Sequence, residues 1–210
     1  MVRIVIVDDH ELVREGLRKV LQNHRDFMIV GEASDSSAAL EIVRSLKPDV
    51  LILDVNLPGR SGLDVLKDIR FQQPLIRVLI LSIYPEERFA LRALRAGASG
   101  YVPKEAAATL IVDAIRTVIS GRRFLTPGVV DLMARSLEET EGQLFDEELS
   151  PRELSVLVLL AEGKSVRDIA RRLTITMNTV YTYRRRLLGK LGLHSNVELT
   201  RYAIQRKLVS

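Results

Sequence analysis

Three aspartates stand directly after apolar stretches of this 210-residue sequence. Asp8 and Asp9 follow the run 2–7, and Asp54 follows the run 50–53 and shortly precedes a Pro-Gly turn. A short apolar run bounded by turn residues is typical of a strand buried on both faces of a parallel sheet. Carboxylates at the carboxyl ends of such strands would lie where open α/β sheets bind their ligands. For Asp54 taken alone, a surface residue that ends a core strand is the more common explanation.

Ser82 and Lys104 extend this set of polar residues. Ser82 ends the run 78–81, and Lys104 follows the short strand expected at 100–102. Three ionised carboxylates close together require a counter-ion, and Mg²⁺ is suitable because it takes oxygen ligands and keeps several waters. Such a pocket would suit a phosphoryl group on Asp54. The metal ion and Lys104 would neutralise the charge of that group, and Ser82 would donate a hydrogen bond to it.

A doubly wound sheet would bring these residues together, and the apolar pattern of residues 1–121 predicts one. Five strand-like runs alternate with five helical patterns. The expected strands are 2–7, 28–31, 50–54, 78–82 and 100–102, and the expected helices are 12–21, 36–46, 62–69, 86–96 and 106–119. This alternation predicts a parallel sheet with helices on both faces and right-handed crossovers. We expect an α/β, flavodoxin-like fold with strand order 2-1-3-4-5, in which the first and third strands are neighbours.

The composition is that of an ordinary globular protein and excludes several kinds of site. The sequence is 47% hydrophobic and 28% charged, which supplies enough apolar material for one or two domains. It contains no cysteine, so disulfides and thiolate metal sites are excluded. The N-terminal apolar run is too short for the core of a signal peptide, and no run approaches the roughly 20 residues of a membrane helix. We therefore expect a cytoplasmic protein with no membrane partner.

Charge is distributed unevenly along the chain. The net charge is 0 over residues 1–121, −4 over residues 122–148 and +8 over residues 149–210, which together give the overall +4. We interpret the first and last parts as domains and 122–148 as a partly mobile linker that could contain a short helix near its start. The basic end favours a polyanionic partner, although solvated helix faces rich in arginine have the same composition.

Residues 149–210 are expected to be entirely helical, with helices near 151–161, 166–173, 177–191 and 197–207. Ser150, Pro151 and Glu153 form a helix-start pattern, with serine as the N-cap, proline at the first position and glutamate at the third. The second and third helices are separated only by Thr174-Ile175-Thr176. Two short helices joined in this way are typical of a helix-turn-helix, so this part is predicted to be an all-α, four-helix domain.

The third of these helices has an apolar side and a polar side. Val180, Leu187 and Leu191 share the apolar side and should pack inward. The polar side offers amide, hydroxyl and guanidinium groups that suit the major groove of DNA, and nearby basic side chains could reach phosphates. The candidate DNA-binding residues are Arg171, Thr176, Asn178, Thr179, Tyr181, Thr182, Tyr183, Arg184, Arg185, Arg186 and Lys190. The alternative is a solvent-exposed basic helix in an interaction domain.

The polar residues of the first domain belong to a larger set: Asp8-Asp9-His10, Asp54, Leu57-Pro58-Gly59, Ser82, Tyr101 and Lys104. With this set, residues 1–121 resemble the receiver domain of bacterial two-component response regulators. The resemblance implies that Asp54 accepts a phosphoryl group from a sensor histidine kinase and that Ser82 and Tyr101 form a switch pair. It also implies that Mg²⁺ is held by Asp9, Asp54 and the main-chain carbonyl of Asn56, with Asp8 acting through water.

One position departs from the receiver pattern. Many receivers have a proline after this lysine, whereas here Pro103 precedes Lys104 and Glu105 follows it. The cis bond that the family often forms between lysine and proline is therefore not expected. We assign no metal role to the three histidines, which share no ligand spacing: His10, His24 and His194.

The second domain carries its own characteristic motifs: Leu149-Ser150-Pro151-Arg152-Glu153, Leu159-Leu160-Ala161-Glu162-Gly163, Ile169-Ala170, Thr179-Val180 and Lys190-Leu191-Gly192-Leu193. With these motifs, residues 149–210 resemble the LuxR-type DNA-binding domain, and the two domains together resemble the NarL/FixJ family. The resemblance implies base contacts by Tyr181, Thr182 and Arg185, and a dimer contact through the helix 197–207. The family often has lysine and histidine where this chain has Tyr181 and Tyr183, which leaves the base preference open.

The leading hypothesis is a transcription regulator whose DNA binding changes when Asp54 is phosphorylated, and which forms a homodimer when phosphorylated. An aspartate-dependent phosphohydrolase is the enzyme alternative. Such enzymes usually need a second aspartate two residues after the nucleophile, and that position is Asn56, so we expect a non-enzyme with no catalytic residues. A receiver coupled to an RNA- or protein-binding output is the third possibility, and the helix-turn-helix spacing argues against it.

Overall fold

The structure is a computed structural model that describes residues 1–58, 60–83, 86–138, 149–206 and 208–209. The chain divides into two compact units, Met1–Glu139 and Thr140–Ser210, and each is described by itself. Gly59 and the last part of the predicted linker, residues 139–148, lie outside the described residues. The domain ends predicted at residues 121 and 149 remain a prediction.

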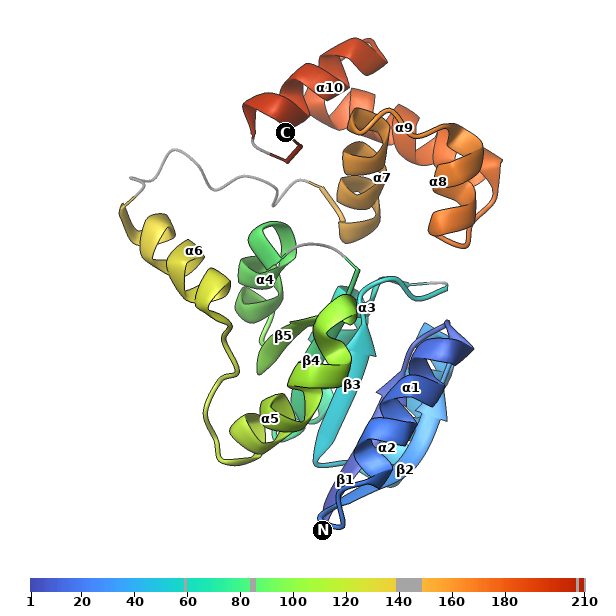
Figure 1. Cartoon of the computed structure of the whole chain (residues 1–210). Coiled ribbons are helices and arrows are strands. Elements are labelled where there is room, and N and C mark those ends of the chain that lie inside the picture. Colours follow the sequence, from blue (N-terminus) through green and yellow to red (C-terminus); the bar gives the residue numbers. More distant parts are fainter. Residues whose placement is uncertain (59, 84–85, 139–148, 207, 210) are drawn as a thin grey trace. The chain divides into compact units, whose positions relative to one another are not determined.

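A five-stranded parallel sheet forms the centre of the first unit (Figure 1). Its strands are β1 (Val2–Val7), β2 (Phe27–Ala33), β3 (Val50–Asp54), β4 (Arg77–Ser82) and β5 (Gly100–Pro103). They are ordered β2-β1-β3-β4-β5. Val7 pairs with Leu53, Asp54 with Leu81, and Ser82 with Pro103, so the carboxyl ends of four strands meet at one edge. The predicted α/β, flavodoxin-like fold with strand order 2-1-3-4-5 is confirmed.

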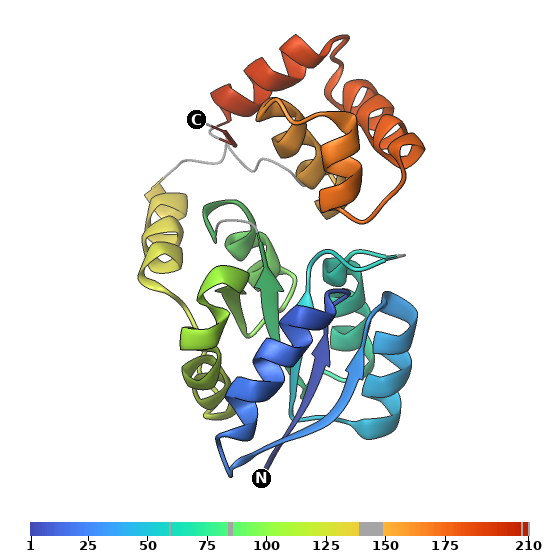
Figure 2. The ribbon, with the colours of Figure 1, turned by 45° about the vertical axis from the view of Figure 1, so that its right-hand side comes forward.

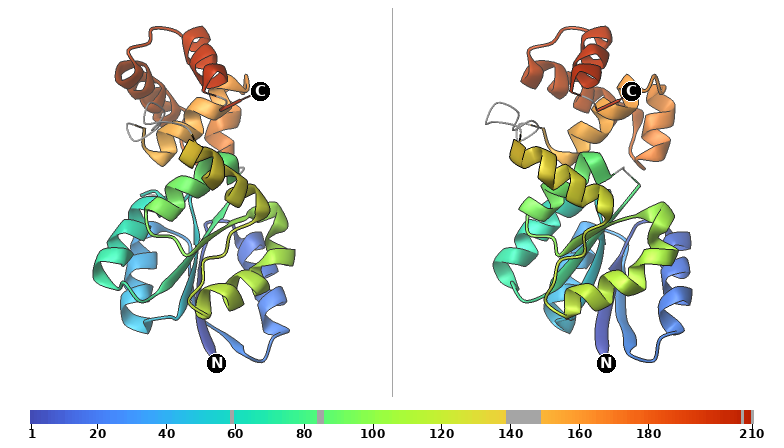
Figure 3. Two further views of the ribbon diagram at one scale, coloured as in Figure 1. Left: turned by 90° about the vertical axis from the view of Figure 1, so that its left-hand side faces the viewer. Right: turned by 60° about the vertical axis from the view of Figure 1, so that its left-hand side comes forward.

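Helices cover both faces of this sheet (Figure 3, left). Helices α1 (Glu11–Gln22) and α5 (Ala107–Ile119) pack together on one face, and α2 (Ser36–Leu46), α3 (Gly62–Gln72) and α4 (Glu86–Arg95) lie on the other. A strand covered on both faces has no solvent side, which explains why all five residues of β3 are buried. The core cluster joins the sheet to α1 and α5 and includes Leu17 and Ile115.

The chain after α5 remains part of the first unit. Phe124 forms a parallel bridge with Gly100, and its N–H donates to the carbonyl of Ser99 at 3.0 Å. Helix α6 (Pro127–Glu138) follows and packs against α4, with Val129 buried in this unit (Figure 1). The helix that the sequence allowed near the start of the linker is therefore present, and it lies on the receiver-like sheet domain.

The second unit is a bundle of α7 (Pro151–Ala161), α8 (Val166–Arg172), α9 (Met177–Leu191) and α10 (Asn196–Gln205), shown in orange and red in Figure 2. Helix α7 begins with the predicted capping box, in which the Glu153 N–H donates to Ser150 Oγ and the Ser150 N–H donates to Glu153 Oε2 at 2.7 Å. Helices α8 and α9 pack against each other across Thr174, which adopts a left-handed φ of 53°. The predicted all-α helix-turn-helix domain is confirmed.

No helix among the described residues is both long enough and apolar enough to cross a membrane. The peptide bonds of the described residues include no cis bond, so Lys104 is not followed by the family's cis peptide.

Candidate functional site

Asp54 is fully buried at the last position of β3, at the carboxyl edge of the sheet. The N–H of Asn56 donates to its Oδ1 at 3.1 Å, which turns the chain back over the carboxylate. Asp8 is equally buried and follows β1, the strand next to β3. The sheet therefore brings together the carboxylates of Asp8 and Asp54, which are 46 residues apart in the sequence.

Lys104 lies between these two carboxylates. Its Nζ is 2.6 Å from Asp8 Oδ2 and 2.9 Å from Asp54 Oδ2. A short 3₁₀ helix, η1 (Lys104–Ala106), follows β5 directly and positions the lysine at this edge. The predicted convergence of Asp8, Asp54 and Lys104 is thus present in the structure.

Burial and charge in this pocket shift the pKa values of both Asp54 and Lys104. Burial raises the pKa of Asp54 to about 6, with Lys104 opposing this rise and Asp8 adding to it. Burial also disfavours the Lys104 cation, but the carboxylates of Asp54 and Asp8 outweigh this effect and raise the pKa of Lys104 overall. At neutral pH the lysine is therefore an ammonium cation, and Asp54 is mostly a carboxylate.

Asp9 and His10 complete the acidic cluster. His10 Nδ1 lies 2.7 Å from Asp9 Oδ1 and 3.3 Å from Asp8 Oδ1. One potential ligand atom from each of Asp8, Asp9, His10 and Asp54 lies within 4.8 Å of the others. From the sequence, His10 was placed in the Asp8-Asp9-His10 motif but was assigned no metal role, although its position beside two aspartates was the available signal.

A hard divalent cation fits this set of groups. Three carboxylates and one ammonium leave two negative charges, and the Asp9 Oδ1 and Asp8 Oδ2 atoms are buried. Carboxylate oxygens are the ligands that Mg²⁺ prefers, and Mg²⁺ binds through one or two carboxylates while keeping waters. The main-chain carbonyl of Asn56, two residues after Asp54 in the loop that follows β3, is a further oxygen of the kind this ion accepts.

Ser82 and Tyr101 lie on the two strands beyond β3. Ser82 ends β4 and is fully buried one residue after the position that pairs with Asp54. Tyr101 lies in β5, where it pairs with Ile80 and is 1% exposed. The structure therefore places the serine at the edge that holds Asp54, and the tyrosine ring inside the unit.

Gly62 is a residue of this site that sequence reasoning missed. Its N–H donates to the carbonyl of Val55 at 2.9 Å, at the start of α3. A Cβ atom on Gly62 would overlap the main-chain oxygen of Asp54. Only glycine allows α3 to start this close to the backbone of Asp54. A glycine after an N-cap serine does not by itself indicate such a close approach, so the sequence did not reveal this role.

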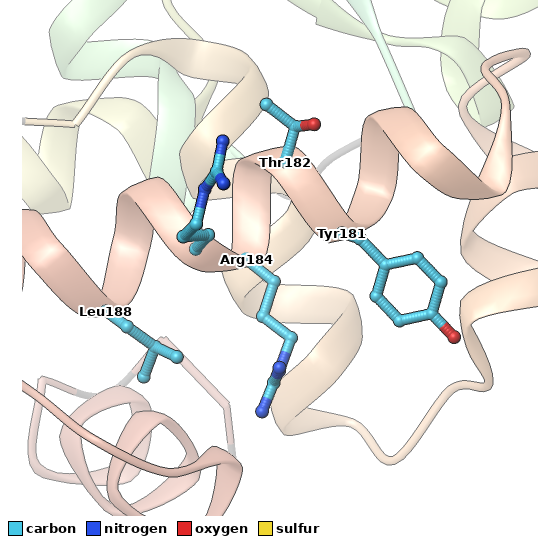
Figure 4. Close-up of a pocket in the computed structure, with 5 residues that line it drawn as sticks. Tyr181, Thr182, Arg184 and Leu188 are labelled. Atoms are coloured by element: carbon cyan, nitrogen blue, oxygen red, sulfur yellow. The ribbon is translucent and has the colours of Figure 1, made fainter.

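The exposed side of α9 forms the second candidate site. Thr176 caps the helix by accepting from the Thr179 N–H at 3.1 Å, and Val180 and Leu187 are fully buried beneath it. The exposed side has an open depression of about 350 Å³ lined by Tyr181, Thr182, Arg184, Arg185 and Leu188. In Figure 4, Tyr181, Arg184 and Leu188 project on one side of the helix and Thr182 on the other.

Lys190 and Arg184, two of the predicted DNA-binding residues, contact side chains of other helices in the second unit. Lys190 Nζ is 2.7 Å from Glu153 Oε2, the carboxylate of the α7 capping box. Arg184 Nε donates to Asn196 Oδ1 at 2.5 Å. A contact between either side chain and DNA would therefore compete with, or share, a contact that stabilises the fold. Asn178, Tyr181, Arg185 and Arg186 are exposed.

Comparison with known families agrees with both parts of the structure. The model of the family described as "Response regulator receiver domain" matches residues 4–116, and that described as "Bacterial regulatory proteins, luxR family" matches residues 147–203. The chain belongs to the response regulators of the NarL/FixJ family, which join a receiver domain to a LuxR-type helix-turn-helix domain.

Two full-length relatives are response regulators. "Response regulator UvrY" of Escherichia coli (strain K12) is 36% identical over 99% of this chain and 96% of its own length. "Response regulator GacA" of Pseudomonas aeruginosa is 34% identical over 100% of this chain and 98% of its own length. The predicted family is confirmed.

Solved structures of RcsB, the first of them the response regulator of Salmonella typhimurium, are similar to the chain. One is 28% identical and covers 96% of this chain and 98% of its own, with a TM-score of 0.62. Another, described as two RcsB dimers bound to two parallel DNAs, is 29% identical over 96% of each chain, with a TM-score of 0.60. These likenesses extend over both units of the chain.

Proposed function

We propose that Asp54 accepts a phosphoryl group from a sensor histidine kinase, and that this modification changes DNA binding by the second unit. The observation that carries the proposal is the Lys104 ammonium, which lies between the buried carboxylates of Asp8 and Asp54. In the transfer, an Asp54 carboxylate oxygen forms a bond to phosphorus while the bond from phosphorus to the kinase histidine breaks. The leaving imidazole keeps the electron pair of that bond.

Mg²⁺ is the proposed cofactor, and it would supply charge neutralisation to the transferring phosphoryl group. Asp9, Asp54 and the main-chain carbonyl of Asn56 would hold the ion, with Asp8 acting through water. Lys104 would exchange part of its contact with the carboxylates for the phosphoryl oxygens. Because Lys104 already balances negative charge at this position, it needs little reorganisation to bind the phosphoryl oxygens.

Ser82 and Tyr101 are the proposed switch residues. The Ser82 hydroxyl would move toward the phosphoryl group and donate a hydrogen bond to it. The ring of Tyr101 would then fill the space that the Ser82 side chain has vacated. Both lie on strands that pack against α4 or α5, so their movement would reach the surface formed by these helices.

The proposed output is double-stranded DNA. The support is the LuxR-type domain and the solved RcsB structures, three of which are described as bound to DNA or to a promoter. Tyr181, Thr182 and Arg185 line the depression on α9 and are proposed to contact bases. The phosphate contacts and helix-end contacts are proposed for Arg171, Thr176, Asn178, Thr179, Tyr183, Arg184, Arg186 and Lys190. We also propose that the protein forms a homodimer after phosphorylation and that it is not an enzyme.

Labelling with acetyl phosphate tests the central step. The wild-type protein incubated with acetyl phosphate and Mg²⁺ should gain one phosphoryl group by intact-mass measurement. Asp54→Asn should gain none, because an amide is not a nucleophile for phosphorus. Labelling of Asp54→Asn to the same extent as the wild type would show that another residue is the acceptor.

A further inference from the structure

A three-residue cluster links α1 to β2 beside the acidic pocket. Arg18 forms a two-pronged contact with Glu32, with Nε donating to Oε1 and Nη2 to Oε2, both at 2.9 Å. Arg14 also contacts this carboxylate, with Nε 3.3 Å from Oε2. Two cations on one carboxylate exceed what is needed to neutralise Glu32, which suggests that one of them has another role.

Arg14 reaches a second partner that Arg18 does not contact in the structure. Its Nη1 donates to the main-chain carbonyl of Asp8 at 2.7 Å. The N–H of the same Asp8 residue donates to the carbonyl of Ala33 on β2 at 3.1 Å. The backbone of Asp8 is therefore held on both sides just after β1 ends, and the orientation of the peptide between Asp8 and Asp9 is fixed by a side chain of α1.

We propose that Arg14 is a positioning residue for the Mg²⁺ site: its guanidinium, anchored on Glu32, fixes the peptide between Asp8 and Asp9 and so holds both carboxylates ready for the ion. This inference rests on the metal role proposed above. Arg14 does not itself bind the ion, since a guanidinium offers only donors. It acts by removing freedom from the loop, because ligands that are ordered before binding lose less entropy when the ion arrives.

Whether neutralising Arg14 weakens or strengthens Mg²⁺ binding distinguishes a positioning role from a purely electrostatic one. Removing a positive charge beside an acidic cluster should by itself strengthen the binding of a cation. Loss of positioning should weaken that binding, and groups that hold metal ligands in place typically matter by about 10–100-fold in affinity. A weaker site after neutralising Arg14 would therefore report the lost bond to the Asp8 carbonyl.

The test compares Arg14→Gln with Arg18→Gln in the full-length protein, using Mg²⁺ alone. The dissociation constant would be followed through the NMR amide signals of Asp9 and His10, and thermal unfolding without Mg²⁺ would be recorded for each variant. We expect Arg14→Gln to bind Mg²⁺ about tenfold more weakly. Arg18→Gln should stay within about twofold of the wild type, because it loses only a contact with Glu32 that is partly exposed.

Equal effects of the two substitutions on Mg²⁺ affinity would overturn the proposal, as would tighter binding by Arg14→Gln. If Arg14→Gln does not fold, Arg14→Lys replaces it. Lysine is shorter than arginine and lacks the guanidinium fork that contacts Glu32 and the Asp8 carbonyl through two separate nitrogens, so weakened binding is again expected and unchanged binding would overturn the proposal. Absence of Mg²⁺ binding in the wild type is a different result: it would remove the proposed metal role and, with it, this inference.

Discussion

At the residue scale, the Lys104 ammonium lies between the buried carboxylates of Asp8 and Asp54. Burial raises the pKa of Asp54 to about 6, and the lysine limits that rise. A nucleophilic carboxylate must be ionised, and a phosphoryl group needs a cation beside it. In the proposed function one side chain, Lys104, which is 50 residues from Asp54 in the sequence, would serve both needs.

Gly62 provides a test of how strictly the backbone of Asp54 is positioned. Gly62→Ala places a Cβ against the Asp54 main chain, where neither backbone can give way. We expect a loss of about 1–3 kcal/mol in the free energy of unfolding of the first unit, together with slower labelling by acetyl phosphate. Urea unfolding and the rate of mass increase measure the two effects.

Gly16→Ala is the matched control, because nothing lies within 4 Å of the added Cβ on the exposed side of α1. It should stabilise the protein by roughly 0.5–1 kcal/mol, as expected for alanine in place of glycine inside a helix, and leave labelling unchanged. Wild-type stability and labelling in Gly62→Ala would show that the close approach of α3 to Asp54 is not required.

Arg185 and Arg186 allow base contacts to be separated from phosphate contacts on α9. Arg185 lines the depression on this helix, and Arg186 does not. Arg185→Ala should weaken binding to a selected duplex by about 1–3 kcal/mol more than binding to random DNA. Arg186→Ala should weaken both about equally. Anisotropy titrations with the two duplexes give the values, and an equal loss of both in Arg185→Ala would assign this arginine to phosphate.

At the scale of secondary-structure elements, regular patterns were predictable and close contacts were not. The helices α2 and α9 have the bounds that apolar spacing predicted, because their buried residues recur at helical positions. The packing of α6 on α4 and the bridge from Phe124 to Gly100 were not predictable, since they depend on where the chain returns after α5. The sequence likewise indicated that Asp54, Asp8 and Lys104 converge, but not which atoms pair.

The start of α7 and the end of α9 are joined by the contact between Glu153 and Lys190, which makes their stability depend on pH. Burial alone would raise the pKa of Glu153, but the hydrogen bonds from Lys190 and Ser150 outweigh it and lower this pKa below its ordinary 4.5. A group whose pKa is lower in the folded protein stabilises the fold above its unfolded pKa. That contribution is lost as the pH falls below about 4.5.

Glu153→Gln should therefore destabilise the second unit by about 1–2 kcal/mol at neutral pH, because it loses the charge but keeps an oxygen for the Ser150 N–H. The difference from the wild type should shrink as the pH is lowered through the region below 4.5. Urea unfolding of the full chain, followed through NMR signals of α7 and α9, gives the free energies. A difference that does not depend on pH would mean that the charge of Glu153 contributes nothing.

At the scale of the whole molecule, a nearly neutral first part and a basic end with a net charge of +8 have different tasks. The first unit contains the acidic pocket. This unit also includes α6, which lies beyond the sheet domain predicted from the sequence. The second contains the helix-turn-helix, whose arginines should make DNA binding fall steeply with salt. The proposed function requires that a phosphoryl group in the first unit changes the DNA affinity of the second.

The most direct test of this claim is the affinity of the full-length protein for a duplex selected from random sequences, measured by anisotropy with and without acetyl phosphate and Mg²⁺. We predict that phosphorylation changes the dissociation constant of the wild type by at least about fivefold. The same treatment should leave the affinity of Asp54→Asn unchanged. An unchanged affinity in phosphorylated wild-type protein, or an equal change in Asp54→Asn, would contradict the claim that Asp54 controls DNA binding.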